Sequence, residues 1–153
     1  MIREANKNDF DSIIELWQEM MDFHIERSNL YQIKPNAKEV YSDYLTYVLK
    51  SPEYVILVFE ADDKIRGYLM ATESSEPPIY DEKVGLILEL SISEKYRNKG
   101  IGETLLDEIE KYFMNKSIKR MECMVSDLNE ISKNFWFKNG YIPYNLMCVK
   151  KLG

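Results

Sequence analysis

Apolar side chains recur every three or four residues in four stretches of the chain, which is the spacing of one face of an α-helix. The predicted helices cover residues 9–23, 37–50, 103–113 and 129–138. Pro52 ends the second helix, because the residue before a proline is disfavoured in the helical conformation. Asn139 and Gly140 are predicted to end the last helix, because these residue types readily adopt the left-handed backbone conformation found at helix C-termini.

Seven shorter apolar stretches are predicted to be strands, at residues 2–4, 54–59, 65–72, 84–93, 120–125, 141–143 and 146–151. The second and third form a hairpin, whereas a helix joins the fourth to the fifth, so those two should be parallel neighbours. The predicted fold is therefore a single α/β domain over residues 1–153. Its mixed, mostly antiparallel sheet has helices on both faces and the order β-α-α-β-β-β-α-β-α-β-β.

The segment from Val84 to Phe113 joins an apolar strand, a short cationic turn and an amphipathic helix. Backbone N–H groups at the start of a helix favour a phosphate or pyrophosphate. The turn RNKGIG is not a dinucleotide fingerprint, because position 105 is Leu, and not a Walker A loop, because Glu103 follows Gly102. It matches in full a third pattern, R/Q-x-x-G-x-G/A after an apolar strand.

The wider segment LELSISEKYRNKGIGETLL resembles the strand–loop–helix consensus of the GNAT superfamily, the acyl-CoA-dependent N-acyltransferases. A second block is also similar: Val125, Asn129 and the sequence FWFKNGY at residues 135–141 resemble that family's V…N…A..FYEKLGF segment. The predicted element order resembles the family's from residue 2 onward. The resemblance implies a GNAT-like sheet in which a bulge splays the fourth and fifth strands apart.

The resemblance also implies a site for acetyl-CoA as co-substrate. Its pyrophosphate would lie on the turn and the helix start, where the two glycines let the backbone approach closely. Its pantetheine arm would bond to the backbone of the fourth strand, and the second block would supply two further contacts. The predicted cofactor-binding residues are Leu90, Ser91, Ile92, Arg97, Asn98, Lys99, Gly100, Ile101, Gly102, Glu103, Thr104, Asn129 and Trp136.

Acyl transfer to an amine needs a group that removes a proton from the nucleophile. Glu89, the only acidic residue within the fourth predicted strand, is the predicted catalytic base. Strict alternation points its side chain away from the face shared by Leu88 and Leu90, unless a bulge shifts the register. The alternative is a solvated or structural carboxylate. Three further carboxylates that could act through water are Glu73, Glu76 and Glu82.

The general acid stays open. Many members of the family have a tyrosine where this chain has Trp136, and an indole cannot protonate a thiolate. Either solvent protonates the leaving thiolate, since a thiol has a pKa near ~8.5, or another tyrosine does so. The candidate tyrosines are Tyr31, Tyr80, Tyr141 and Tyr144.

The resemblance places the acceptor between the first two helices and the loop before the fourth strand, at residues 23–37 and 74–83. Acidic and aromatic side chains there could hold a cationic amine through charge and cation–π contact, and they equally suit solvated loops. These residues are Glu26, Tyr31, Tyr80, Asp81 and Glu82.

Composition and charge restrict the partners. The formal net charge of −6 argues against nucleic acid, because phosphate backbones need clustered Lys and Arg. Cys123 and Cys148 are too few and too far apart for a disulfide framework or a metal site. No apolar run follows a basic start and none has the length of a membrane span, which predicts a cytoplasmic protein without a membrane partner.

These features predict an acetyl-CoA-dependent N-acetyltransferase that acts on a primary amine, with a small-molecule amine favoured. A protein N-terminus or lysine as acceptor, a non-catalytic acyl-CoA-binding module and a nucleotide-binding domain stay open as alternatives. The resemblance also implies a homodimer, since members of this family are commonly dimers.

Overall fold

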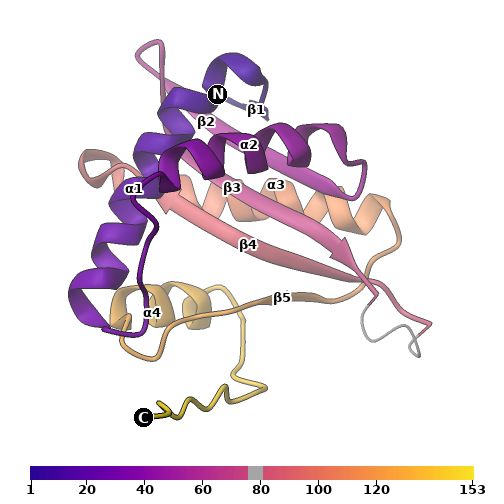
Figure 1. Cartoon of the computed structure of the whole chain (residues 1–153). Coiled ribbons are helices and arrows are strands. Elements are labelled where there is room, and N and C mark those ends of the chain that lie inside the picture. Colours follow the sequence, from indigo (N-terminus) through magenta and orange to yellow (C-terminus); the bar gives the residue numbers. More distant parts are fainter. Residues whose placement is uncertain (76–80) are drawn as a thin grey trace.

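The computed structural model describes residues 1–75 and 81–153. Within them a five-stranded sheet is covered by α1 and α2 on one face and by α3 and α4 on the other (Figure 1). The strands are β1 (Ile2–Glu4), β2 (Tyr54–Ala61), β3 (Lys64–Ser74), β4 (Val84–Ile92) and β5 (Met121–Cys123). The helices are α1 (Phe10–Arg27), α2 (Ala37–Lys50), α3 (Ile101–Asn115) and α4 (Glu130–Lys138), with single 3-10 turns at Lys7–Asp9 and Glu94–Tyr96.

The strands lie side by side in chain order. The pairs from β1 to β4 are antiparallel, and β4 pairs with β5 in parallel, as the sequence predicts. That parallel pairing joins only Gly85–Ile87 to Met121–Cys123, and β4 then continues to Ile92 without β5 beside it. Beyond this point β4 and the segment that follows β5 diverge (Figure 1), which confirms the predicted splay of the fourth and fifth strands.

Each face of the sheet has its own core. On the α1/α2 face, Ile13, Leu45, Val58 and Tyr68 are among the fully buried side chains. On the α3/α4 face, the corresponding residues are Leu69, Leu105, Leu106, Ile109 and Phe113. Because alternate residues of a strand point to opposite faces, β3 supplies both cores from adjacent positions.

The N-terminal end of α1 is fixed to β1 by an ion pair and a capping box. Arg3 donates from Nη1 and Nη2 to the two carboxylate oxygens of Asp9, each at 2.8 Å. Asp9 also accepts from the backbone of Asn6, whose side chain caps the same turn. The Arg3 guanidinium holds the pKa of the buried Asp9 carboxyl below its usual value.

The two predicted terminal strands, at residues 141–143 and 146–151, are wrong: residues 141–153 contain no strand. The segment leaves α4 as an extended chain (Figure 1), with Ile142 81%, Leu146 93% and Met147 81% exposed. Pro143 has no N–H to donate, the three residues of β5 offer a short edge, and an isolated hairpin is marginal in water. Pro77 and Pro78, between β3 and β4 in the sequence, lie outside the described residues.

Candidate functional site

A bulge in β4 decides where Glu89 points. Across the β3–β4 pair, Met70 lies opposite Glu89 and Ala71 opposite Ile87, so Leu88 is an extra residue without a partner. Ile87 packs in the α3/α4 core, and the extra residue turns Glu89 to the α1/α2 face instead of the face that strict alternation from Ile87 requires. The register shift that the sequence left open therefore occurs.

Two tyrosines hold the Glu89 carboxylate. The hydroxyl of Tyr41, from α2, donates to Oε2 at 2.5 Å, and the hydroxyl of Tyr68, from β3, donates to the same oxygen at 2.7 Å. The two hydroxyl oxygens lie 3.3 Å apart. Burial raises the pKa of Glu89 above its usual value, and the two O–H donors oppose that rise. Among the described carboxylates, this one combines a raised pKa with a place on the splayed strand.

The tyrosines themselves stay protonated. Burial, reinforced by the neighbouring carboxylate, raises the pKa of Tyr41 and that of Tyr68 well above the usual value. The sequence analysis singled out neither side chain. They lie 48 and 21 positions from Glu89 in the chain, so no local motif could have indicated them.

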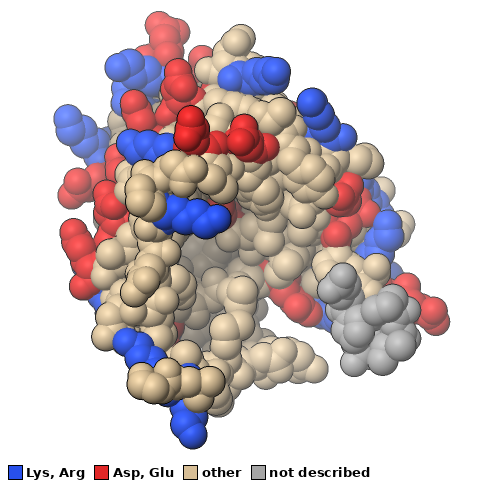
Figure 2. Space-filling view, viewed as in Figure 1, with Lys and Arg blue, Asp and Glu red and all other residues tan. Residues whose placement is uncertain are grey.

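An aromatic cavity of about 370 Å³ lies beside this cluster, between α1, α2 and the segment that joins them. Its walls are mainly Trp17, Ile33, Ala37, Val40, Tyr41 and Tyr44. The rings of Trp17 and Tyr41 stack with centroids 4.3 Å apart. Gln32 and Lys34 complete the lining. On the face drawn in Figure 2, the molecule is hollowed beside this joining segment, and mostly uncharged residues form the walls.

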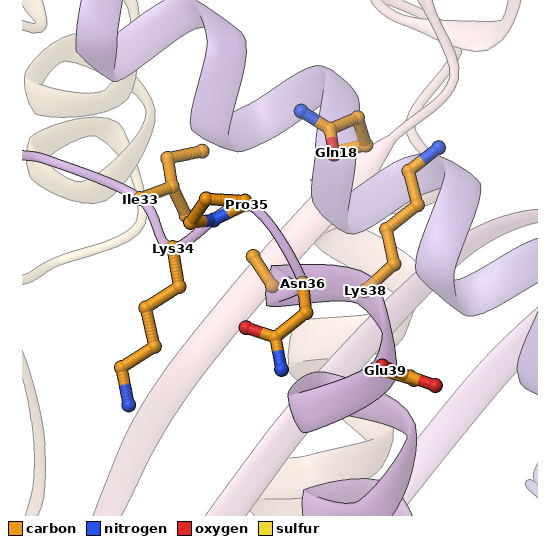
Figure 3. Close-up of a pocket in the computed structure, with 8 residues that line it drawn as sticks. Gln18, Ile33, Lys34, Pro35, Asn36, Lys38 and Glu39 are labelled. Carbon is orange, nitrogen blue, oxygen red and sulfur yellow. The ribbon is translucent and has the colours of Figure 1, made fainter.

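A second, more polar cavity of about 550 Å³ shares Ile33, Lys34 and Ala37 with the first. Its remaining lining comes from Gln18, Pro35, Asn36, Lys38 and Glu39. In Figure 3, Lys38 extends toward Gln18 of α1, whereas Lys34 points to the opposite side. The charged residues around both cavities are therefore two lysines and one glutamate.

The glycine turn opens α3 as predicted. Gly100 has a φ of +76°, and a Cβ there would meet nothing within 4 Å, so glycine is needed for its backbone conformation rather than for space. The first N–H groups of a helix, here of Ile101, Gly102 and Glu103, have no carbonyl one turn back. Helical bonding begins with the N–H of Thr104, which donates to the carbonyl oxygen of Gly100 at 3.0 Å.

Gly102 also has a packing role that the sequence did not indicate. A Cβ at this position would lie 3.0 Å from Cε2 of Phe135, so its absence lets α3 pack against α4. Close approach to a ligand is the reason that the sequence suggested. The structure adds a packing reason that involves a residue 33 positions away (135 − 102).

The remaining cationic and polar residues of the segment are anchored to their surroundings. Arg97 donates from Nε to the carbonyl oxygen of Ile92 at 2.9 Å, which ties the turn to the end of β4. Lys99 lies with its Nζ 4.8 Å from the ring centroid of Tyr96, and Asn98 has a positive φ of 58°. In β4, Ser91 donates from Oγ to the carbonyl oxygen of Leu16 in α1, and Leu90 packs on the opposite core.

The second block forms a compact unit at the start of α4. Asn129 is the N-cap, and its Oδ1 accepts from the backbone N–H of Ser132 at 3.0 Å. Trp136 is buried, donates its indole N–H to Oγ of Ser132 at 3.1 Å, and packs edge-on against Tyr141. Asn129 caps the helix, a role that is compatible with a cofactor contact.

The tyrosines predicted as candidate general acids lie in different parts of the structure. The hydroxyl of Tyr141 is buried, and burial raises its pKa. Tyr144 is almost fully exposed in the C-terminal segment, and Tyr31 lies beside His24. Tyr80 falls outside the described residues, so the structure singles out no tyrosine as the acid.

Most of the other predicted carboxylates are exposed or paired elsewhere. Glu73 forms ion pairs with Lys83 and Lys116, which hold its pKa below the usual value. Glu26 lies next to Arg27 on the last turn of α1. Asp81 and Glu82 precede β4, at the end of the strand remote from Glu89, and Glu76 lies outside the described residues.

Across residues 1–75 and 81–153, no helix has the length and apolarity needed to cross a bilayer. In the same residues, no three or more His, Cys, Asp or Glu side chains are grouped as a metal site would require.

Sequence comparison relates the chain to acetyltransferases. The profile of the acetyltransferase (GNAT) family matches residues 11–141. An Archaeoglobus fulgidus protein named an uncharacterized N-acetyltransferase is 26% identical over 136 residues, which cover 88% of each chain. A Thermoplasma acidophilum spermidine N(1)-acetyltransferase is 28% identical over 148 residues, which cover 92% of this chain and 86% of that protein.

Solved structures share the fold. A mutant of a Bacillus halodurans protein aligns over 99% of both chains with a TM-score of 0.89 and 22% identity. An aminoglycoside N-acetyltransferase in complex with coenzyme A aligns over 99% of this chain and 93% of its own, with a TM-score of 0.77 and 16% identity. These likenesses confirm the predicted α/β architecture.

Proposed function

Because the chain belongs to the acetyltransferase (GNAT) family and is an acyltransferase, we propose that it transfers the acetyl group of acetyl-CoA to a small-molecule primary amine. The observation that carries this proposal is the position of Glu89, a carboxylate on the splayed part of β4 beside an aromatic cavity. The names of two relatives, a spermidine and an aminoglycoside acetyltransferase, support a small amine as acceptor. The cytoplasm remains the predicted location.

The residues present fit coenzyme A. The left-handed Gly100 and the N–H groups of Ile101 and Gly102 at the start of α3 make a cradle for a pyrophosphate, and the positive end of the α3 dipole adds attraction. Beyond Ile87, β4 has no pairing with β5 among the described residues, so Leu90 and Ile92 can bond to an extended arm, whereas the backbone of Ser91 faces β3. The carbonyl of Ile92 is already bonded to Arg97, which leaves its N–H for this contact.

Bound acetyl-CoA would supply an activated acyl group, and the chain would supply the proton transfers. Glu89 accepts a proton from the ammonium group of the acceptor, which leaves a neutral amine. The nitrogen then attacks the carbonyl carbon, the C–N bond forms, the C–S bond breaks, and the nitrogen loses its second proton to solvent to give the amide. A backbone N–H of Leu90 or Ile92 polarises the carbonyl oxygen. Solvent protonates the thiolate, and Glu89 returns its proton to solvent.

The test combines binding with turnover. Acetyl-CoA should stabilise the chain against heat, and free thiol should appear faster when a small amine is added. Binding without turnover on any amine or peptide would instead identify a non-catalytic module. Thermal stabilisation by NAD or ATP but none by coenzyme A would overturn the assignment of the turn. Faster turnover on peptides than on every small amine would replace the proposed acceptor by a protein.

The homodimer belongs to this proposal as well. Residues 141–153 expose apolar side chains that a second copy of the chain could cover, among them Leu146 and Met147. Sedimentation of the full chain should give twice the monomer mass. The double substitution Leu146→Asp with Met147→Asp should return the monomer, and a monomeric wild type would contradict the dimer.

A further inference from the structure

The lining of the two cavities between α1 and α2 does not suit a polycationic acceptor. We propose that the acceptor is a primary amine with a single positive charge on an apolar or aromatic body, bound in the aromatic cavity with its ammonium group at Glu89. The inference rests on the proposed function and names the class of acceptor. It separates this chain from its Thermoplasma acidophilum relative, which is named for spermidine.

The first argument is the chemistry of the walls. The cavity of about 370 Å³ presents the rings of Trp17, Tyr41 and Tyr44 together with aliphatic side chains. Burial raises the pKa of Tyr44 to about 12, so its ring stays uncharged at neutral pH. Aromatic faces stabilise an ammonium group and also an apolar body behind it. The volume lies at the small end of the range of ~300–1,000 Å³ found for ligand pockets.

The second argument is the sign of the charges. Lys34 is the only charged side chain among the described residues that line this cavity. The adjoining cavity adds Lys38 and Glu39, so the charged lining of both together is two cations and one anion. A polyamine or an aminoglycoside carries further ammonium groups beyond the reacting one. In this position they would meet lysines rather than carboxylates, and like charges repel.

The third argument is the free oxygen of Glu89. Both tyrosine hydroxyls donate to Oε2, and within the described residues no hydrogen bond occupies Oε1. One carboxylate oxygen is therefore fixed and the other is available to a single ammonium group. Tyr41 links Glu89 to the cavity, because its ring lines the cavity and its hydroxyl donates to Oε2 of Glu89.

A matched pair of acceptors tests the charge argument directly. Hexylamine and 1,6-diaminohexane have the same chain length and differ by one ammonium group. Thiol release from acetyl-CoA should give hexylamine and 2-phenylethylamine a kcat/KM at least about tenfold above that of the diamine, spermidine or an aminoglycoside. If the diamine, spermidine or the aminoglycoside is used equally well or better, the inference is wrong and the acetyltransferase stands. If no amine is acetylated, the proposed function itself is wrong.

Two substitutions test whether the charge of Lys34 causes the discrimination against the diamine. Lys34→Glu should raise the ratio of kcat/KM for the diamine to kcat/KM for hexylamine about three- to tenfold. Lys7→Glu, which makes the same charge change on an exposed turn outside both cavities, should leave the ratio of the two amines unchanged. Equal ratios in the Lys34→Glu variant and the wild type would contradict the proposed cavity.

The aromatic wall has its own test. Tyr44→Phe keeps the ring and should keep KM for 2-phenylethylamine, whereas Tyr44→Leu should raise that KM about tenfold with little change in kcat. Both variants keep a large apolar side chain at a half-buried site, so the fold should persist. A Tyr44→Leu enzyme with an unchanged KM would place the acceptor elsewhere.

Discussion

The two faces of the sheet carry the two halves of the proposed site, and the chain builds them in opposite ways. On the α3 face, the proposed cofactor half is a continuous segment of eight residues, 97–104, which joins the turn to the start of α3 and offers backbone groups. On the α1 face, the proton-transfer half joins Tyr41, Tyr68 and Glu89, which are far apart in the chain and offer side chains. The first half therefore depends on backbone conformation, and the second on the packing of α1 and α2.

This difference separates the effects that substitutions should have. A change on the α3 face should alter affinity for coenzyme A, and a change on the α1 face should alter turnover and acceptor binding. The two faces share β4, so each test needs both measurements. The expected effects below run from the largest to the smallest.

Glu89→Gln should lower kcat/KM for the amine by about 10²–10⁴-fold, because the amide cannot accept the proton of the ammonium group. Calorimetry should find the affinity for coenzyme A within about twofold of wild type. Glu73→Gln is the matched control: its carboxylate is paired with Lys83 and Lys116, and its loss should leave turnover unchanged. If Glu73→Gln were the inactive variant, the base would lie on the other side of β4.

Gly100→Val should weaken binding of coenzyme A at least about tenfold, since a β-branched residue at this positive φ distorts the turn. Gly140→Val is its control, because Gly140 also has a positive φ, of 85°, with nothing within 4 Å of a Cβ. Both variants should lose similar thermal stability, and only the first should lose affinity in calorimetry. Equal affinity in the two variants would remove the turn from the cofactor site.

The same contrast explains which parts of the site could be predicted from the sequence. The turn was predictable because its glycines, its arginine and the helix start are consecutive, so one short pattern holds the geometry. Glu89 could be singled out from the sequence, but the face of the sheet to which its side chain points could not. That face depends on Leu88, which has no partner in β3. Tyr41 and Tyr68 had no local signal, since their alignment on one oxygen exists only after α2 packs on the sheet.

The fold shows the same limit. Helices and strands with strong periodicity were predictable from β1 to α4, and α1 continues to Arg27 rather than ending at Phe23. The two C-terminal strands were wrong because apolar content alone predicts a strand only where a neighbouring edge is available. Gly102 was assigned to ligand approach, and its contact with Phe135 of α4 was invisible in the sequence.

Tyr41→Phe and Tyr68→Phe test whether the two tyrosine hydroxyls lower the pKa of Glu89. Each removes an O–H that lowers the pKa of Glu89, so that pKa should rise further and the acidic limb of the pH–rate profile should move to higher pH. At a pH on that limb, turnover should fall about three- to tenfold, which corresponds to the net free energy of one ordinary hydrogen bond. Tyr44→Phe has no such bond to remove. An unshifted profile in both variants would mean that the tyrosines do not tune the base.

Asp9→Ala should have the smallest effect on the site and the clearest effect on stability. It removes the ion pair to Arg3 and the bond that completes the cap, so the free energy of unfolding should fall by about 2 kcal/mol near neutral pH. The folded pKa of Asp9 is depressed, so this contribution is present above the unfolded value of about 3.9 and is lost as the pH falls below it. Denaturant titrations at pH 7 and pH 3 measure the difference.

Asp9→Ala also divides the two faces, because α1 carries Trp17, whereas its contact with the turn is the exposed ion pair of Glu19 with Arg97. We expect a modest rise, of about twofold, in KM for the amine and none in the Kd for coenzyme A. A change confined to coenzyme A binding would contradict the separation of the halves.

The unpaired Leu88 has a consequence for how the chain reaches its native pairing. A chain that anchored Gly85–Ile87 correctly but continued β4 in strict alternation would direct Glu89 into the apolar core beneath α3. An unpaired carboxylate in that core would destabilise the misaligned pairing by about 3–5 kcal/mol relative to the native one. The misaligned hairpin would therefore be disfavoured as it formed, and the residue proposed to move a proton also guides β3 and β4 into their correct alignment during folding.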